Sequence, residues 1–281
     1  MSANIIDGKK LATNIKDDLK NKITLLKQKP NLAVIIVGSN PASQIYVKNK
    51  EKACQDVGII TTTYKLDANT TEKELENLII TLNNDKNINA ILIQLPLPSH
   101  IDTQKCLSLI NPIKDVDGFH PLNSGLLQKK SSSAIIPCTP NGIIKILHSI
   151  KNDLTGLNAV VIGRSQIVGL PVANLLLNEN CTVTIAHSKT QNLASICKNA
   201  DILVVAVGIP ELITKEYIKK GAIIIDVGIN RTNEGLKGDV NHKDALYLAS
   251  YLTPVPGGVG PMTIAMLLEN TYQAYLKQNN S

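Results

Sequence analysis

The 281-residue sequence lacks several features that mark common protein classes. It has no Trp and a single Phe, so few aromatic side chains are available for stacking on the bases of single-stranded nucleic acid. Its N-terminus is polar, and no apolar run approaches the roughly 20 residues that span a bilayer. We therefore expect a soluble cytoplasmic protein that binds neither nucleic acid nor a membrane.

Cysteine and histidine form no pattern typical of a disulfide framework or a metal site. The five cysteines include no CxxC pair, and their odd number without a signal peptide favours reduced, buried thiols. The five histidines show no HExxH or comparable zinc pattern, so no metal site is predicted. The net charge of +6 comes from scattered lysines, which favours a solvated surface and is compatible with attraction to anionic small substrates.

Apolar, β-branched runs alternate with helical patterns through most of the chain. Most of the runs are continuously apolar, which is typical of parallel strands buried on both faces. The predicted strands are Leu32–Val37, Thr61–Leu66, Ala90–Leu95, Ala159–Ile162, Thr182–Ala186, Ile202–Val207 and Ala222–Val227. The predicted helices are Ser43–Val57, Glu72–Asn83, Thr139–Ile150, Val168–Asn178, Asn192–Lys198, Lys215–Lys219 and Pro261–Lys277.

A region rich in turn-forming residues, 111–140, divides the strands into two groups. We therefore expect two α/β domains with a cleft between them that binds a ligand. The first domain is predicted to span residues 1–140. The second, Rossmann-like with a mainly parallel sheet, is predicted over residues 141–260. A C-terminal helix over residues 261–281 is expected to pack back on the first domain.

The second group opens with a strand, a glycine turn and a helix in the segment LNAVVIGRSQIVGLP. Gly163 and Gly169 do not complete a GxGxxG motif, so this segment alone is a weak indication of nucleotide binding. The next strand ends in HSKT, without the Asp or Glu that binds the ribose 2′-hydroxyl of NAD. Arg164 and Ser188 could instead bind a 2′-phosphate through charge-assisted hydrogen bonds. The sequence therefore predicts NADP and redox chemistry.

The helix predicted over SQIYVKNKEKACQDV carries three lysines, of which one faces inward. At 3.6 residues per turn, Tyr46, Lys50 and Val57 fall on one stripe, whereas Lys48 and Lys52 face away. Desolvation favours a neutral amine, so Lys50 could carry a proton near neutral pH. The alternative is a lysine whose stem covers the core while its amine reaches water, and spacing alone favours this alternative.

Three further polar residues follow predicted strands or lie in turns. Gln94 interrupts a buried strand just before Pro96 and Pro98, at the strand end where open α/β sheets bind ligands. A glutamine that tethers the loop is an equal alternative. Asp115 and Asp117 lie in a glycine-containing turn, which Asx turns explain without a ligand.

Several segments together resemble the bifunctional methylenetetrahydrofolate dehydrogenase/methenyltetrahydrofolate cyclohydrolase family. They are VGSNPASQIYVKNKEKACQDVGI, QLPLPSHID, PIKDVDGFHPLNSG, PCTPNGI, VIGRSQIVGLPVANLL, DVGINR and TPVPGGVGPMTIAMLLENT. They occur in the family's order over nearly the whole chain. The resemblance implies NADP-dependent oxidation of 5,10-methylenetetrahydrofolate to 5,10-methenyltetrahydrofolate, then hydrolysis to 10-formyltetrahydrofolate, in one-carbon metabolism. It also implies a homodimer.

The resemblance assigns roles to individual residues. Four match the catalytic set: Lys50 as the catalytic lysine, Tyr46 as the tyrosine packed on the folate, Gln94 as the lysine's hydrogen-bond partner, and Asp117 as the pterin-binding aspartate. These four also belong to the substrate site, together with Pro256, Gly257 and Gly258. The residues that match cofactor contacts are Gly163, Arg164, Ser165, Ser188 and Ile229.

Three alternatives stay open. A short-chain dehydrogenase also uses Tyr-x-x-x-Lys, but there the pair follows the nucleotide-binding glycines, whereas Tyr46 and Lys50 precede them by more than a hundred residues. A dehydrogenase-only member would not hydrolyse the methenyl product, and the presence of both Lys50 and Gln94 argues against it. A non-catalytic folate- or nucleotide-binding regulator would bind NADP without reducing it.

Overall fold

The computed structural model describes residues 2–279, so the first residue of the predicted first domain and the last two of the predicted C-terminal helix lie outside the described residues. The chain divides into two compact units. The six-stranded unit contains the chain up to Thr13 and Thr139–Thr263, and the three-stranded unit contains Asn14–Cys138 and the chain from Ile264 onward.

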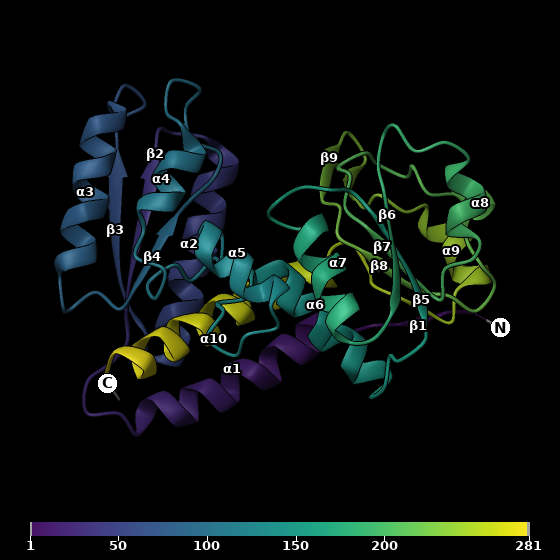
Figure 1. Cartoon of the computed structure of the whole chain (residues 1–281), viewed down its shortest axis with the longest axis horizontal. Coiled ribbons are helices and arrows are strands. Elements are labelled where there is room, and N and C mark those ends of the chain that lie inside the picture. Colours follow the sequence, from purple (N-terminus) through teal and green to yellow (C-terminus); the bar gives the residue numbers. More distant parts are fainter. Residues whose placement is uncertain (1, 280–281) are drawn as a thin grey trace. The chain divides into compact units, whose positions relative to one another are not determined.

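The three-stranded unit is built on parallel strands in the order β3-β2-β4 (Figure 1). Its elements are β2 (Asn31–Val37), α2 (Pro41–Val57), β3 (Ile60–Leu66), α3 (Glu72–Asn84), β4 (Ala90–Ile93), α4 (Thr103–Leu109) and α5 (Pro121–Gln128). One core cluster joins α3 and α4 to one face of β2 and β4. All four residues of β4 are buried, as expected of a parallel strand covered on both faces.

Local sequence signals explain where the helices of this unit begin and end. The Asn40 side chain accepts a hydrogen bond from the Ser43 N–H at the start of α2, and Pro41 occupies the first turn. The helix ends at Gly58, whose φ of 87° is the left-handed conformation that glycine adopts readily. Thr71 forms a capping box that starts α3. The first two signals fix the ends of α2, the helix that carries Lys50.

The six-stranded unit contains a parallel sheet in the order β1-β11-β8-β7-β5-β6. Its sheet strands are β1 (Asn4–Ile5), β5 (Asn158–Ile162), β6 (Thr182–Ala186), β7 (Ile202–Val205), β8 (Ile223–Asp226) and β11 (Tyr251–Leu252). Its helices are α6 (Cys138–Ile150), α7 (Gly169–Asn178), α8 (Leu193–Cys197), the 3₁₀ turn η1 (Lys215–Tyr217) and α9 (His242–Leu248). A small hairpin, β9 (Asn230–Thr232) and β10 (Gly235–Lys237), follows β8. Apart from the additional edge strand β1, the strand order and parallel direction are those of a dinucleotide-binding sheet without its third strand.

Two long helices, α1 (Gly8–Thr24) and α10 (Val259–Asn279), contain boundaries between the units, after Thr13 and after Thr263. Within the three-stranded unit, Asn270 of α10 donates from Nδ2 to the carbonyl oxygens of Val116 and Ile136, both at 2.9 Å. Among the helices of residues 2–279, none has the length and apolar character required to cross a bilayer.

The predicted fold class, an α/β protein whose second half is Rossmann-like and mainly parallel, is confirmed. The domain division differs at the N-terminus, because β1 pairs with β11 and so joins the six-stranded sheet. The helix predicted at Lys215–Lys219 is wrong, since only a 3₁₀ turn forms there. Four helices were not predicted: α1, α4, α5 and α9. The polar, glycine-containing sequence of α5 resembles a turn, and its N-terminus is instead fixed by Pro121 and by the His120 side chain, which accepts from the Leu122 N–H.

Candidate active site

The topological switch point of the three-stranded sheet lies at the carboxyl ends of β2 and β4. The chain leaves β2 toward β3 on one side, and β4 lies on the other side, so this is where a ligand binds in an open α/β sheet. Gln94 follows β4 directly, and its N–H donates to the Ile35 carbonyl at 2.8 Å. A parallel bridge between Ile91 and Asp115 brings the DVDG turn to the same edge. The sheet therefore places Gln94 and Asp117 near each other.

Lys50 reaches this edge from α2. Its Nζ donates to Oε1 of Gln94 at 3.1 Å. The Gln94 Nε2 donates to the Leu95 carbonyl at 2.8 Å, which fixes the amide so that its oxygen faces the lysine. Lys50 is half-buried, so its amine is hydrogen-bonded within the protein rather than simply extended into water.

Tyr46 lies differently from the predicted stripe. The buried face of α2 includes Val47 and Val57, with Lys50 at its edge, whereas Tyr46 is 43% exposed. One residue corresponds to about 100° around a helix, so the position next to Val47 turns away from the core. The tyrosine side chain therefore presents surface that a ligand can cover.

Asp117 is half-buried, and desolvation raises the pKa of its carboxyl group, while the positive charge of Lys50 acts in the opposite direction. The Cys138 Sγ donates to the Val116 carbonyl at 3.3 Å and lies 3.9 Å from Oδ1 of Asp117. Burial raises the pKa of the Cys138 thiol well above its usual value, so the group is a protonated donor. An amine, an amide, a carboxyl group and a thiol thus meet at one strand edge.

Asp115 has a structural position in the same turn. It is buried, and its carboxylate accepts hydrogen bonds from the N–H groups of Gly118 and His120 at 3.1 and 2.8 Å. It also accepts from Nδ2 of Asn123 at 2.9 Å. Hydrogen bonds within and beside the turn therefore explain why Asp115 is buried. They do not explain why Asp117 is half-buried.

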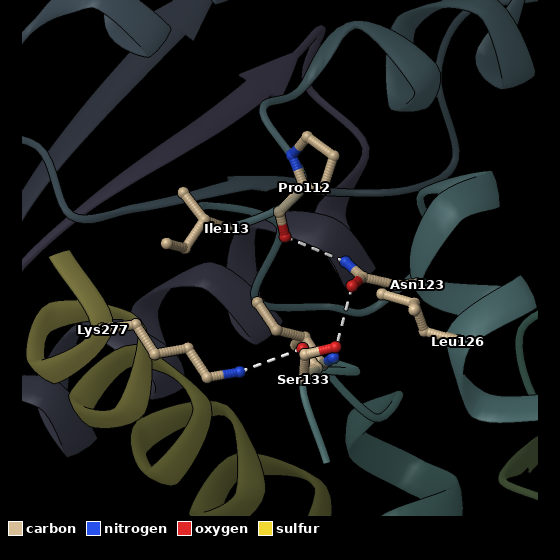
Figure 2. Close-up of a pocket in the computed structure, with 7 residues that line it drawn as sticks. Pro112, Ile113, Asn123, Leu126, Ser133 and Lys277 are labelled. Atoms are coloured by element: carbon tan, nitrogen blue, oxygen red, sulfur yellow. Dashed lines mark hydrogen bonds between the residues drawn. The ribbon is translucent and has the colours of Figure 1, made fainter. Parts of the chain in front are cut away.

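Asn123 of α5 connects the loop before this helix to the loop after it (Figure 2). Its Nδ2 donates to the Pro112 carbonyl at 3.0 Å, and its Oδ1 accepts from the Ile135 N–H at 3.3 Å. The pocket drawn in Figure 2, about 200 Å³, lies beside it and is also lined by Lys277, which donates to the Ser133 carbonyl at 3.0 Å. None of the predicted site residues lines this pocket, so it is not the candidate site.

The six-stranded unit has its own crevice position, at the carboxyl ends of β5 and β7. Gly163 follows β5 with a φ of 122°, and a Cβ at this position would lie 2.3 Å from the Ala206 carbonyl oxygen. Only glycine fits there, which lets the two strand ends approach closely. Ser165 Oγ accepts from the N–H groups of Val168 and Gly169 at 3.2 and 3.3 Å, just before α7.

Arg164 and Ser188 lie at neighbouring strand ends. Ile162 is paired with Ala186 in the β5–β6 register, and each of the two polar residues lies two positions beyond its member of this pair. Both are exposed, and the turn after β6 contains no acidic residue. This arrangement fits the 2′-phosphate of NADP, because a carboxylate at that place would repel it.

The remaining predicted residues lie elsewhere in the six-stranded unit. Ile229 is 44% exposed and follows β8. Pro256, Gly257 and Gly258 connect β11 to α10. The structure thus brings Lys50, Gln94 and Asp117 together in one unit. All the predicted cofactor contacts belong to the other unit, as does the Pro256–Gly258 turn.

Fold and sites together define a two-unit α/β protein with a dinucleotide-binding sheet. Residues 6–117 match the family model described as the tetrahydrofolate dehydrogenase/cyclohydrolase catalytic domain, and residues 137–279 match the model of the NAD(P)-binding domain of the same family. The chain belongs to the tetrahydrofolate dehydrogenase/cyclohydrolase family.

Individual relatives agree with this assignment. The chain is 53% identical over 278 residues to the bifunctional protein FolD of Acetivibrio thermocellus, covering 98% of this chain and 97% of that one. The structure is similar to the bifunctional FolD enzyme of Campylobacter jejuni, with a TM-score of 0.96, 48% identity and coverage of 98% and 100%. It is also similar to the Trypanosoma brucei enzyme in complex with NADP and an inhibitor, with a TM-score of 0.95, 40% identity and full coverage of both chains.

Two residues beside Asp117 were not predicted from the sequence. Cys138 was interpreted only as a buried thiol, and Asn270 was not singled out at all. A signal for Asn270 was available, because it falls one helical turn after Met266, on the side of the helix that continues the apolar run IAMLL. An amide at such a position requires a buried hydrogen-bond partner, which the Val116 and Ile136 carbonyls supply.

Proposed function

We propose that this chain oxidises 5,10-methylenetetrahydrofolate to 5,10-methenyltetrahydrofolate with NADP and then hydrolyses the product to 10-formyltetrahydrofolate. The family match over both halves supports both activities and the cofactor. The observation that carries the residue assignment is the 3.1 Å hydrogen bond from Lys50 to Gln94 beside Asp117. The three-stranded unit is the proposed folate-binding half, and the six-stranded unit is the proposed NADP-binding half.

The oxidation requires alignment more than proton transfer. NADP⁺, when bound, supplies the acceptor for hydride. The methylene carbon loses hydride to become a cation shared between N5 and N10 of the folate, so no base has to remove a proton. Holding reacting groups in place can contribute about 7–11 kcal/mol. We propose that Asp117 orients the pterin by accepting its N–H groups and that Tyr46 covers the folate with its exposed ring.

The hydrolysis does require proton transfer. Water adds to the cationic carbon and loses one proton. The resulting hydroxyl group loses its remaining proton as the carbonyl forms and the bond from carbon to N5 breaks, and N5 gains a proton, so that one proton is released overall. Lys50 is the proposed carrier of these protons, with its amine oriented by Gln94 Oε1. General acid–base catalysis of this kind contributes typically about 10²–10⁴-fold. Pro256, Gly257 and Gly258 are proposed as further substrate contacts on the strength of the resemblance.

The nucleotide end of the site has Gly163, Arg164, Ser165, Ser188 and Ile229 as its proposed contacts. Arg164→Ala should weaken NADP binding by about 10- to 100-fold, because a hydrogen bond to a charged group contributes about 1.5–3 kcal/mol. NAD binding should change little, since NAD carries no 2′-phosphate. Titration with each cofactor measures the ratio of the NADP and NAD affinities. Arg231→Ala, which removes the chain's other arginine, is the control. An unchanged NADP/NAD ratio would refute the assignment of Arg164 to the phosphate.

A coupled spectrophotometric assay tests the overall function. Methylenetetrahydrofolate is supplied with NADP or NAD, and formation and decay of the methenyl product are followed. We expect reduction of NADP followed by decay of the methenyl signal. Methenyl product that accumulates at the uncatalysed decay rate would indicate a dehydrogenase-only enzyme. NADP that binds without being reduced would indicate a non-catalytic binding protein.

We also propose that the protein acts in the cytoplasm as a homodimer and supplies one-carbon units for purine, methionine and histidine biosynthesis. The resemblance to the family supports these points. Sedimentation of the purified protein tests the dimer, since a monomer at the concentration used for the assay would contradict it.

A further inference from the structure

Two buried carboxyl groups lie side by side at the carboxyl edge of the six-stranded sheet. Asp226, the last residue of β8, is 4% exposed, and Asp239 is fully buried. The Asp226 carboxyl group accepts hydrogen bonds from the N–H groups of Gly228, Asp239 and Val240 at 3.1, 2.9 and 3.0 Å. One side chain therefore ties the residues that enter the β9–β10 hairpin to those that leave it.

Asp239 extends this connection to a neighbouring strand. Its Oδ2 accepts from the N–H groups of Val207 and Gly208, at 2.7 and 2.9 Å, in the loop that follows β7. Its Oδ1 accepts from Nδ2 of Asn230 at 2.9 Å. The Asp239 carboxylate thus holds the loop after β7 to the segment that follows the hairpin, in addition to the backbone pairing of Ile213 with Val240.

The packing around the pair is too tight for a side chain in the loop. A Cβ at Gly228 would lie 2.1 Å from Oδ1 of Asp239. Ile229, a proposed cofactor contact, is the next residue, and it is placed between this glycine and Asn230. Its position is therefore set on both sides by groups that touch Asp239.

The order of strands indicates which part of the cofactor passes here. The proposed 2′-phosphate contacts, Arg164 and Ser188, follow β5 and β6, and the glycine turn for the pyrophosphate follows β5. A dinucleotide that crosses the carboxyl edge from β6 through β5 continues over β7 and β8. The half with the nicotinamide must therefore lie over the loops that Asp226 and Asp239 hold.

We propose that Asp226 and Asp239 are positioning residues for the nicotinamide half of the NADP site. They act through the backbone of Val207, Gly208 and Gly228 and through Asn230. This proposal rests on the NADP-dependent function given above.

The experiment compares two probes that differ in which half of the site they occupy. NADP covers the whole site, whereas adenosine 2′,5′-bisphosphate covers only the end with Arg164 and Ser188. Asp239→Asn should weaken NADP binding by about tenfold or more. The N–H groups of Val207 and Gly208 would then face an amide nitrogen, which cannot accept their hydrogen bonds, instead of a carboxylate oxygen. Binding of the bisphosphate should stay within about twofold of the parent, as measured by titration calorimetry.

Asp201→Asn is the matched control. Asp201 lies at the opposite edge of the same sheet, where its carboxylate accepts from the Asn158 N–H at 2.9 Å and pairs with Lys219. This variant should leave the affinities for both probes unchanged. If Asp239→Asn does not fold, Asn230→Ala removes a single donor to Asp239 and should weaken NADP selectively, by a smaller factor.

Three outcomes separate the possibilities. Selective loss of NADP affinity supports the positioning role. Equal weakening of both probes, or unchanged NADP affinity in both variants, overturns it. If the parent protein binds neither probe, the proposed cofactor function itself is at fault, which distinguishes the two failures.

Discussion

Lys50→Met is expected to abolish methenyl hydrolysis, with a loss of about 10²–10⁴-fold, while NADP affinity stays near that of the parent. Methionine has an apolar stem of similar length, so it can occupy the same place on α2. It has no amine, so it can neither carry a proton nor donate to Gln94. Lys50 and the proposed cofactor contacts belong to different compact units, which is why cofactor binding should be spared. Decay of the methenyl chromophore measures the first effect and NADP titration the second.

Lys52→Met is the matched control, because Lys52 lies on the same helix but is exposed. It should hydrolyse the methenyl substrate at the parent rate. Equal hydrolysis by Lys50→Met and the parent would remove Lys50 from the mechanism. Loss of NADP affinity in Lys50→Met would instead indicate general damage to the fold.

Asp226→Asn is expected to change how the free energy of unfolding depends on pH. Desolvation, together with the nearby charge of Asp239, raises the Asp226 pKa from 3.8 to about 7, although three N–H donors act in the opposite direction. Glu211, Lys237 and His242 line the small pocket beside it, and Lys237 is paired with Glu211.

The sign follows from proton binding in the two states. Between pH 4 and 7 the folded protein binds a proton at Asp226 that the unfolded chain does not bind, so stability falls as pH rises through this window. From pH 5 to pH 8 the free energy of unfolding of the parent should fall by about 2.5 kcal/mol because of this group. The asparagine variant should not show this fall.

Urea unfolding of both proteins at several pH values measures the difference. Asp201→Asn is the control, because the Lys219 hydrogen bond lowers the Asp201 pKa below 3.8 and that group does not titrate in this range. If the difference in unfolding free energy between the parent and Asp226→Asn is constant from pH 5 to 8, the three N–H donors outweigh burial and keep Asp226 ionised.

The sequence predicts the repeating α/β pattern well because the buried parallel strands are continuously apolar. β4 and β5 are examples, since each lies in a run of Ala, Ile, Leu and Val. α5 was missed because its residues are typical of a turn, and because it is supported by Pro121 and by hydrogen bonds of Asn123 to Pro112 and Ile135 in the loops on either side. β1 was missed because two residues carry no periodic signal and pair only in the folded sheet.

The candidate site divides in the same way. Spacing predicts that Lys50 faces inward, but by itself it favours a lysine whose amine reaches water, and only the family resemblance implies a catalytic role. The hydrogen bond to Gln94 joins residues 44 positions apart, which no local pattern can indicate. Asp226 and Asp239 were not singled out, because burial of an aspartate depends on N–H donors supplied by other loops. A single sequence therefore predicts which polar residues lie at strand ends, but not which hydrogen bonds these residues form with one another.

The distribution of the three-stranded unit along the chain has a consequence for biosynthesis. Val116 and Ile136 receive their side-chain donor from Asn270, which lies 154 and 134 residues further along the chain. A ribosome releases the N-terminal part of a chain first, and domains usually fold as they emerge. Here the half that carries Lys50 can complete its fold only after α10 has been translated, so its exposed core is open to chaperones and proteases while the six-stranded unit is being made.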